Sequence, residues 1–149
     1  MGQQQLLLVI LVTVIVGVAT VVAISVFGKG AENANIDATR QDVLTLAAQA
    51  QAWVIKPELL GGGNGDFTGV TVDEIGYGYD SREANGLTFE NANATFVIAG
   101  DAAELSITAT PKQLDGIDPD ASTDWTSTEF KATVTRASIN FDSVPTRTP

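Results

Sequence analysis

An unbroken apolar segment, Leu6–Phe27, restricts what this chain can become more than any other part of it. The segment contains no charged residue, and its apolar run is interrupted only at Thr13, Gly17, Thr20 and Ser25. As a helix it is about 33 Å long, enough to cross a hydrocarbon layer of about 30 Å. Val and Ile suit a strand in water, but an isolated strand in lipid leaves its amides unpaired. The segment is therefore predicted to be a helix.

Three uses of such a helix are open. A cleaved secretory signal needs a basic beginning, an apolar stretch of roughly 7–15 residues and a small-x-small cleavage site. Residues 1–5 carry no charged side chain, the apolar run is longer, and residues 27–30 (Phe-Gly-Lys-Gly) make a poor cleavage site. A plain membrane anchor fits the run equally well. In the third use the helix is stored in the membrane and later packed into a polymer, a use that depends on the nature of the remaining chain.

Charge separates the chain into an apolar part and an acidic part. With 8 Lys and Arg against 18 Asp and Glu, the net charge is −10, and every charged residue lies after Gly28. This acidic part disfavours nucleic acid, which needs a basic surface. The chain has no His and no Cys, which removes the usual bases, thiol nucleophiles and zinc ligands. We therefore predict neither an enzyme nor a cofactor. Lys29 alone flanks the apolar segment, and by itself it would place the acidic part in the cytoplasm.

Helical periodicity resumes after the glycines at 28 and 30, where we expect a loosened turn. Apolar residues then recur at three- and four-residue steps and form one stripe. They are Ile36, Val43, Leu44, Ala47, Ala50 and Val54, with Leu46 and Trp53 beside them. The pattern predicts an amphipathic helix over residues 31–56 that ends before Pro57 and places a folded domain directly after the apolar helix.

The rest of the chain has the pattern of short strands. Residues 61–66 form a Gly-rich crossover, and the Gly-Lys-Ser/Thr of a phosphate-binding loop does not come after them. Strands are predicted over 67–75, 87–89, 94–98, 105–110 and 130–137, the last extended by 138–141. Together they predict an antiparallel sheet of about four or five strands within 67–142, covered on its apolar face by the helix. The predicted fold class is α+β, with an apolar helix over 1–28 and a globular domain over 29–149.

This plan resembles that of the type IV pilin family. Residues 50–71 (AQAWVIKPELLGGGNGDFTGVT) resemble a helix-to-sheet junction of bacterial pilin-like proteins that open with Met-Gly-Gln-Gln-Gln-Leu, as this chain does. The resemblance covers residues 1–71, and beyond them only the general plan of strands. It implies subunits that wait in the inner membrane, are extracted by a pilus assembly machinery, and pack their N-terminal helices into the core of an extracellular filament.

The start of the chain departs from the usual pilin pattern. In that family a peptidase cleaves after a Gly, and a Glu stands at the fifth mature position. If Gly2 is that Gly, the mature chain starts at Gln3 and its fifth residue is Leu7. The charged partner for a neighbour's amino terminus is then absent, and the glutamines at 3–5 are left to hydrogen-bond helix-start amides or neighbouring subunits.

The residues expected to form the filament core are apolar positions along the first helix. Small residues at 17, 19 and 23 allow such helices to approach closely. The predicted core positions are Leu6, Leu7, Leu8, Ile10, Leu11, Val14, Gly17, Val18, Val21 and Ile24.

Two further sites rest on short patterns. Carboxylates at Asp115, Asp118, Asp120 and Asp124 are a calcium candidate, although their spacing is not that of an EF-hand loop and a solvated acidic loop is the alternative. Asn93 begins an Asn-Ala-Thr glycosylation acceptor pattern.

The sequence thus predicts a structural subunit that polymerises with copies of itself through its apolar helix. Its expected location is the inner membrane before assembly and an extracellular filament afterwards. A minor pilin or a secretion-system pseudopilin is an alternative of the same class. A single-span, membrane-anchored extracellular binding domain is the alternative of a different class.

Overall fold

The computed structural model describes residues 2–114 and 125–147 of the chain. By its internal contacts the chain divides into two units, Met1–Ala34 and Asn35–Pro149. The four acidic residues of the calcium candidate lie outside the described residues.

The first element is a single long helix, α1 (Gly2–Ile55). It ends one residue before the predicted limit, because a residue that precedes proline disfavours the helical region and Pro57 comes soon after. Residues 28–30 are helical, so the two glycines do not interrupt the hydrogen-bonded turns there.

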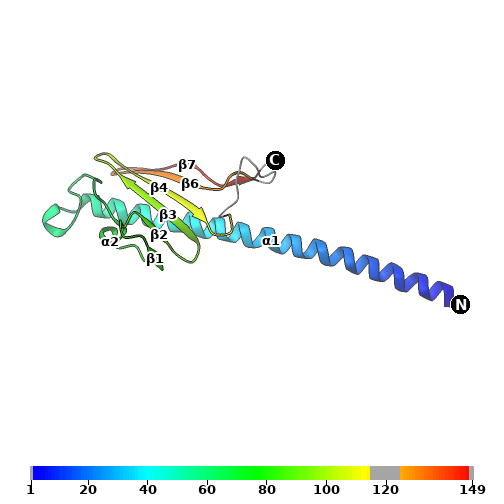
Figure 1. Cartoon of the computed structure of the whole chain (residues 1–149). Helices are drawn as coiled ribbons and strands as arrows, with labels where there is room; N and C mark the ends of the chain where they lie inside the picture. The colour runs from blue at the N-terminus through cyan, green and yellow to red at the C-terminus, as the bar shows by residue number, and fades with distance from the viewer. Residues whose placement is uncertain (1, 115–124, 148–149) are drawn as a thin grey trace. The chain divides into compact units, whose positions relative to one another are not determined.

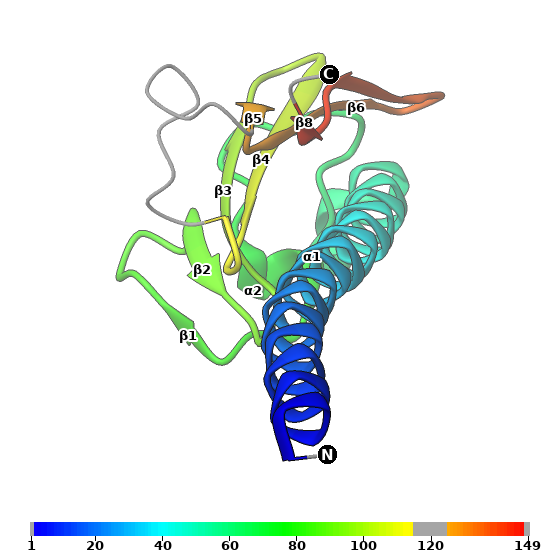
Figure 2. The ribbon, with the colours of Figure 1, turned by 90° about the vertical axis from the view of Figure 1, so that its right-hand side faces the viewer.

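The second unit contains a six-stranded sheet in the order β1-β2-β3-β4-β6-β7, with every neighbouring pair antiparallel (Figure 1). A separate two-stranded sheet pairs β5 with β8, beside the β6 side of the main sheet (Figure 2). The strands are β1 (Ser81–Arg82), β2 (Thr88–Glu90), β3 (Ala94–Gly100), β4 (Glu104–Pro111), β5 (Trp125–Ser127), β6 (Phe130–Thr135), β7 (Ile139–Ser143) and β8 (Thr146–Arg147).

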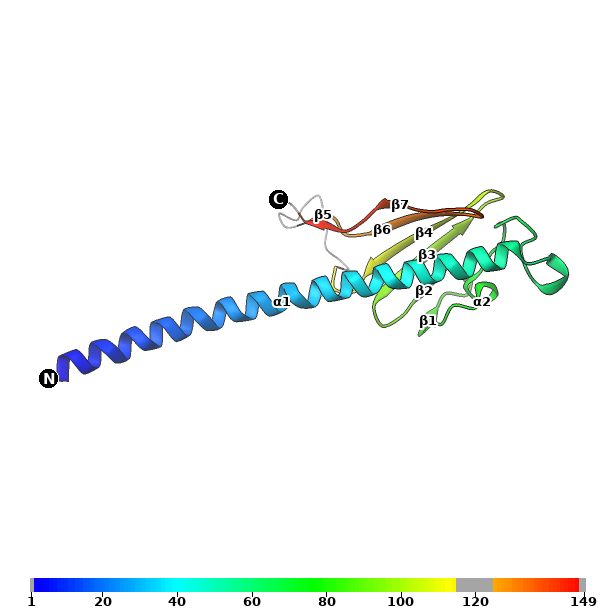
Figure 3. The same ribbon diagram turned by 180° about the vertical axis from the view of Figure 1, so that it is seen from behind.

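The second half of α1 lies along one face of this sheet (Figures 1 and 3). Its buried residues repeat at three- and four-residue steps, as the amphipathic pattern predicts. They are Ile36, Thr39, Val43, Leu46, Ala47, Ala50, Trp53 and Val54. Gln51 ties the helix to the sheet by donating from Nε2 to the Thr135 carbonyl (2.8 Å). A helix on an antiparallel sheet confirms the predicted α+β class.

The core between helix and sheet is centred on aromatic rings. Phe89 on β2 and Phe96 on β3 are paired across the strands and stack with ring centroids 5.2 Å apart. Tyr77 meets both rings from the edge of the cluster. The alternating burial of β3 and β4 puts their apolar side chains on this one face.

The prediction of a first strand over 67–75 is wrong. The segment instead contains a short helix, α2 (Val72–Ile75), with a capping box in which Thr71 and Glu74 bond each other's backbone amides. Gly76 ends α2 in the left-handed conformation (φ 77°). The buried residues 67, 70, 72 and 75 are spaced by three, two and three, and so do not alternate as a strand requires.

The prediction that residues 138–141 extend the preceding strand is also wrong. The chain reverses after Thr135, whose hydroxyl accepts hydrogen bonds from the amides of Ala137 and Ser138 (3.3 and 3.0 Å). This local turn competes with the extended backbone, as Thr side chains often do. The result is a hairpin of β6 and β7, and the main sheet has six strands where four or five are predicted.

The Gly-rich crossover packs tightly against the end of α1. The short helix η1 (Glu58–Leu60) precedes it, and backbone bonds run from Gly63 N to Trp53 O (3.0 Å) and from Asn64 N to Lys56 O (3.0 Å). A Cβ at Gly63 would come within 2.9 Å of the Trp53 ring carbon Cη2, so this glycine is needed for the close approach.

Candidate functional site

The candidate site is the apolar surface of α1 within the first unit. Every described residue from Gly2 to Ala31 is exposed. Leu11 is 60% exposed, Val21 69% and Phe27 78%. A large exposed apolar surface of this kind marks a site of contact with protein or membrane. All the predicted core positions lie on this exposed helix, and no apolar side chain of the first unit is buried among its described residues.

Polar atoms on this surface are satisfied by the helix itself. The hydroxyls of Thr13, Thr20 and Ser25 donate to the carbonyls of Ile10, Val16 and Val22, each at 2.8 Å. Because of these bonds to the preceding turn, each of the three hydroxyls has a hydrogen-bond acceptor within the helix. The helix can therefore enter lipid or a bundle of helices without an unpaired hydroxyl at these positions.

Length and composition make this helix able to cross a membrane. The described residues contain one helix that is long and apolar enough to do so, with a mean hydropathy of 3.1 in its most apolar window. Gly17 lies in the middle of that surface, and a Cβ built there would meet nothing within 4 Å apart from the adjacent helix backbone. This position is open to close approach by another helix.

Asn93, the glycosylation candidate, belongs to a hydrogen-bonded network in the second unit. Its Nδ2 donates to Oδ2 of Asp42 (2.8 Å), and the same oxygen accepts from Asn91 Nδ2 (2.9 Å). Asn91 also donates to the Tyr77 hydroxyl (3.1 Å). Attachment of a sugar at Asn93 Nδ2 would require this partly buried bond to Asp42 to open, so the network favours a structural role for the residue.

Burial within this network also changes the ionisation of the Tyr77 hydroxyl. Burial, and after it the Asp42 carboxylate, raises the pKa of Tyr77 from its ordinary 10.0 to about 12. The Tyr77 hydroxyl therefore keeps its proton to a higher pH than an ordinary tyrosine does.

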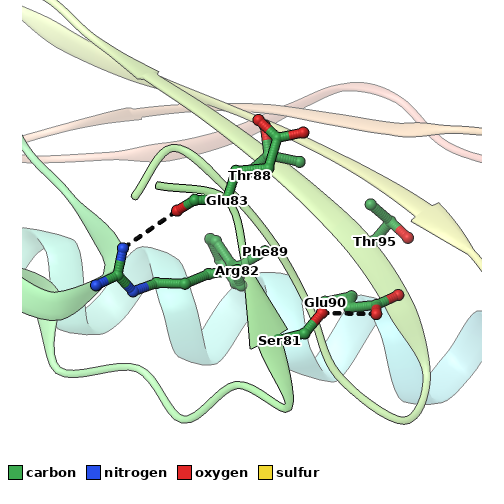
Figure 4. Close-up of a pocket in the computed structure, with 7 residues that line it drawn as sticks. All are labelled: Ser81, Arg82, Glu83, Thr88, Phe89, Glu90 and Thr95. Atoms are coloured by element: carbon green, nitrogen blue, oxygen red, sulfur yellow. Dashed lines mark hydrogen bonds between the residues drawn. The ribbon is translucent and has the colours of Figure 1, made fainter. Parts of the chain in front are cut away.

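A depression of about 240 Å³ lies over β1 and β2 (Figure 4). On one side of it Arg82 pairs with Asp73 (3.1 Å) and donates to the Tyr79 hydroxyl (3.0 Å); the bond to Tyr79, followed by Asp73, raises the Arg82 pKa. On the other side Ser81 donates to Glu90 (2.7 Å), and this bond, followed by Lys112, lowers the Glu90 pKa. Arg82 and Glu90 thus each have charged and neutral partners, and these contacts fasten the β1 edge.

Among the described residues, no group of three or more His, Cys, Asp or Glu side chains is arranged to hold a metal ion. Sequence reasoning misses the cluster of Tyr79, Arg82 and Asp73, which only the fold brings together. It also assigns Leu44 to the buried stripe, whereas this residue lies on the outward side of α1 and is 36% exposed. The sequence feature that could have drawn attention to this exposed, uncharged side of α1 is the absence of any charged residue between positions 43 and 55.

Comparison with protein-family models, with curated proteins and with solved structures finds no match to this chain. The two features of the chain that bear on its function are the exposed apolar helix and the acidic domain that comes after it.

Proposed function

We propose that this protein is the structural subunit of a type IV pilus-like extracellular filament. The observation that carries the proposal is an uncharged, fully exposed apolar helix joined through one continuous α1 to an acidic α+β domain. Apolar surface is driven out of water by about 25 cal/mol for each Å² buried. A bundle of such helices provides that burial once the subunit leaves the membrane. The acidic domains then form the water-exposed outer layer of the polymer.

The main alternative is a single-span anchor that holds the domain at the membrane. The length and composition of the helix favour it as much as they favour a filament. The two functions differ in what finally surrounds the helix. An anchor keeps its helix in lipid, whereas a filament subunit packs its helix against neighbouring helices. In minor pilins and pseudopilins the apolar helix would pack in the same way. The property that would separate them from a main subunit is their abundance in the filament.

The direct experiment is to shear the source cells and to analyse the released filaments by intact mass and N-terminal sequencing. We expect this chain to be the main polypeptide, with the apolar segment present. The same measurement gives the first mature residue, which the resemblance places at Gln3. Finding the chain only in the membrane fraction would favour the anchor, and finding it as a trace component would favour a minor subunit.

A substitution at Gly17 separates the filament from the anchor. Gly17→Leu raises both apolarity and helix propensity, so an anchor should tolerate it. In a polymer the larger side chain holds helices apart at a close contact. We expect full recovery in the membrane fraction together with at least about a tenfold loss of sheared filaments, equivalent to about 1.4 kcal/mol of packing.

Two matched variants control this result. Gly17→Ala adds one methyl group and should retain most filaments. Leu11→Glu places a carboxylate in the apolar segment, at a cost on the order of 3 kcal/mol, and should abolish filaments. Abundant normal filaments from both Gly17→Leu and Leu11→Glu would refute packing through this helix.

A further inference from the structure

In the second unit, the outward side of α1 carries an uncharged groove. Between Val43 and Ile55 the helix has no charged residue, although the chain has a net charge of −10. A surface helix of a soluble domain normally presents charged residues to water. Here the groove is a shallow, open depression of about 420 Å³ along one helix face, and all of its lining residues belong to α1: Gln41, Leu44, Thr45, Ala48, Gln49 and Ala52. Its floor includes two alanines, which leave room for a large apolar side chain.

In the same unit the chain continues beyond the end of α1 into the loop that contains η1 (Figure 1), whose two exposed leucines form an apolar knob. In η1, Leu59 is 96% exposed and Leu60 64%, while Ile55 before them is 67% exposed. The turn is held by backbone bonds from Leu60 N to Pro57 O and from Gly61 N to Glu58 O, both 2.9 Å. Because the knob is already ordered, it loses little conformational freedom when a partner covers it.

We infer that the Leu59–Leu60 knob of one copy docks in the α1 groove of a neighbouring copy. The inference rests on the proposed function, since a filament is what brings copies together. Two acidic domains repel each other wherever carboxylates meet, and both the groove and the two leucines lack charge. Glu58 beside the knob is exposed and can remain in water.

The geometry of this contact suits an open polymer. The knob and the groove are different surfaces of one molecule, so each copy uses its knob on one neighbour and offers its groove to another. Such a head-to-tail contact repeats without limit when its rotation does not close a ring. The contact would bind the outer domains of successive subunits, in addition to the packing of the apolar helices.

The natural absence of cysteine allows a direct test on full-length chains in sheared filaments. In the double variant Ala48→Cys/Leu59→Cys, oxidation should link knob to groove and give a ladder of covalent multimers on a non-reducing gel. The bond is not expected within one chain, because residues 48 and 55 are about 10 Å apart along the helix, Leu59 lies in η1 beyond the helix end, and disulfides need Cα atoms within about 7 Å. The matched control, Ala103→Cys/Leu59→Cys, places the second thiol on an exposed turn between β3 and β4 and should stay monomeric.

Filaments grown from a mixture of the two single variants, Ala48→Cys and Leu59→Cys, distinguish the direction of the contact. Each chain in this mixture carries a single cysteine and can form only one bond, so dimers and no ladder are expected. Each single variant alone should give monomers, and dimers from either one would overturn the head-to-tail contact. A charge exchange adds a second readout: Leu59→Glu should lower filament yield about tenfold, and added Ala48→Lys should restore it.

Failure of this inference can be told from failure of the proposed function. If filaments form and the Ala48→Cys/Leu59→Cys chain stays monomeric in them, the contact is refuted and the filament remains. If the natural chain forms no filaments, the proposed function falls, and the same oxidation is carried out on membranes. A ladder there would support the contact between anchored copies, and monomers there would refute it.

Discussion

Tyr77 is the residue whose ionisation depends most clearly on the fold, since burial and the Asp42 carboxylate raise its pKa to about 12. In a Tyr79→Phe background only Tyr77 titrates among the tyrosines, because the chain has two of them. We expect tyrosinate absorbance of the detergent-solubilised chain to rise near pH 12, and Asp42→Asn to lower that pKa by removing a nearby negative charge. A transition near 10 in the parent, or one unmoved by Asp42→Asn, would contradict this assignment.

The sign of the linked stability is set by the raised pKa. Between pH 10 and about 12 the folded chain keeps a proton on Tyr77 that the unfolded chain has lost. The stabilising contribution is therefore complete below pH 10 and disappears as the pH rises through about 12. Sequence alone does not reveal this pKa. Asp42 and Tyr77 lie far apart in the chain, and only folding brings them together with Asn91.

At the scale of elements, the β3–β4 hairpin depends on a glycine at its end. A Cβ on Gly100 would come within 2.7 Å of Val70 Cγ1 and would also collide with the Phe67 carbonyl. Gly100→Ala should therefore lower the free energy of unfolding by about 1–3 kcal/mol, the usual cost of overpacking. Gly78→Ala is the matched control, because a Cβ there meets nothing within 4 Å. Thermal unfolding detected by near-ultraviolet circular dichroism makes the comparison, and equal midpoints would contradict the predicted clash.

The elements that sequence predicts well are those with a long, regular pattern. Strands β3 and β4 alternate cleanly, and the buried side of α1 repeats every three or four residues, so both are predicted close to their observed limits. The α2 segment is mistaken for a strand because its Val and Ile favour strands, while the capping box of Thr71 and Glu74 decides for a helix. The reversal after Thr135 has no glycine or proline to mark it, and a hydroxyl makes the turn instead.

Leu44 shows why the candidate site is only partly predictable. The exposed apolar helix over residues 6–27 is apparent from composition, because a run this long and apolar is typical of a membrane-spanning helix. The groove on the second half of α1 is less apparent. When the apolar stripe of a helix is wide, a residue at its outer margin, such as Leu44, follows the same three- and four-residue steps as the buried residues. The structure places Leu44 on the exposed side.

At the scale of the whole molecule, the two units differ in what they need in order to be stable. Within residues 2–114 and 125–147, all the buried apolar residues belong to the second unit, beginning at Ile36. The charges of Lys29 and Glu32 cancel, so residues 35–149 carry the entire net charge of −10. We expect a chain that starts at Asn35 to fold alone and to dissolve without detergent, because its core is intact and its charge opposes association.

The expected product is a monomer, since a knob-and-groove contact of this size is weak without the many simultaneous contacts of a polymer. Light scattering after size-exclusion chromatography gives its mass, and near-ultraviolet circular dichroism compares its packing with that of the full chain. Adding the first 34 residues back should make the protein depend on detergent while leaving the unfolding of the domain unchanged. If the shortened chain aggregated or lost its near-ultraviolet signal, the first unit would have to stabilise the domain, which the burial of the core residues argues against.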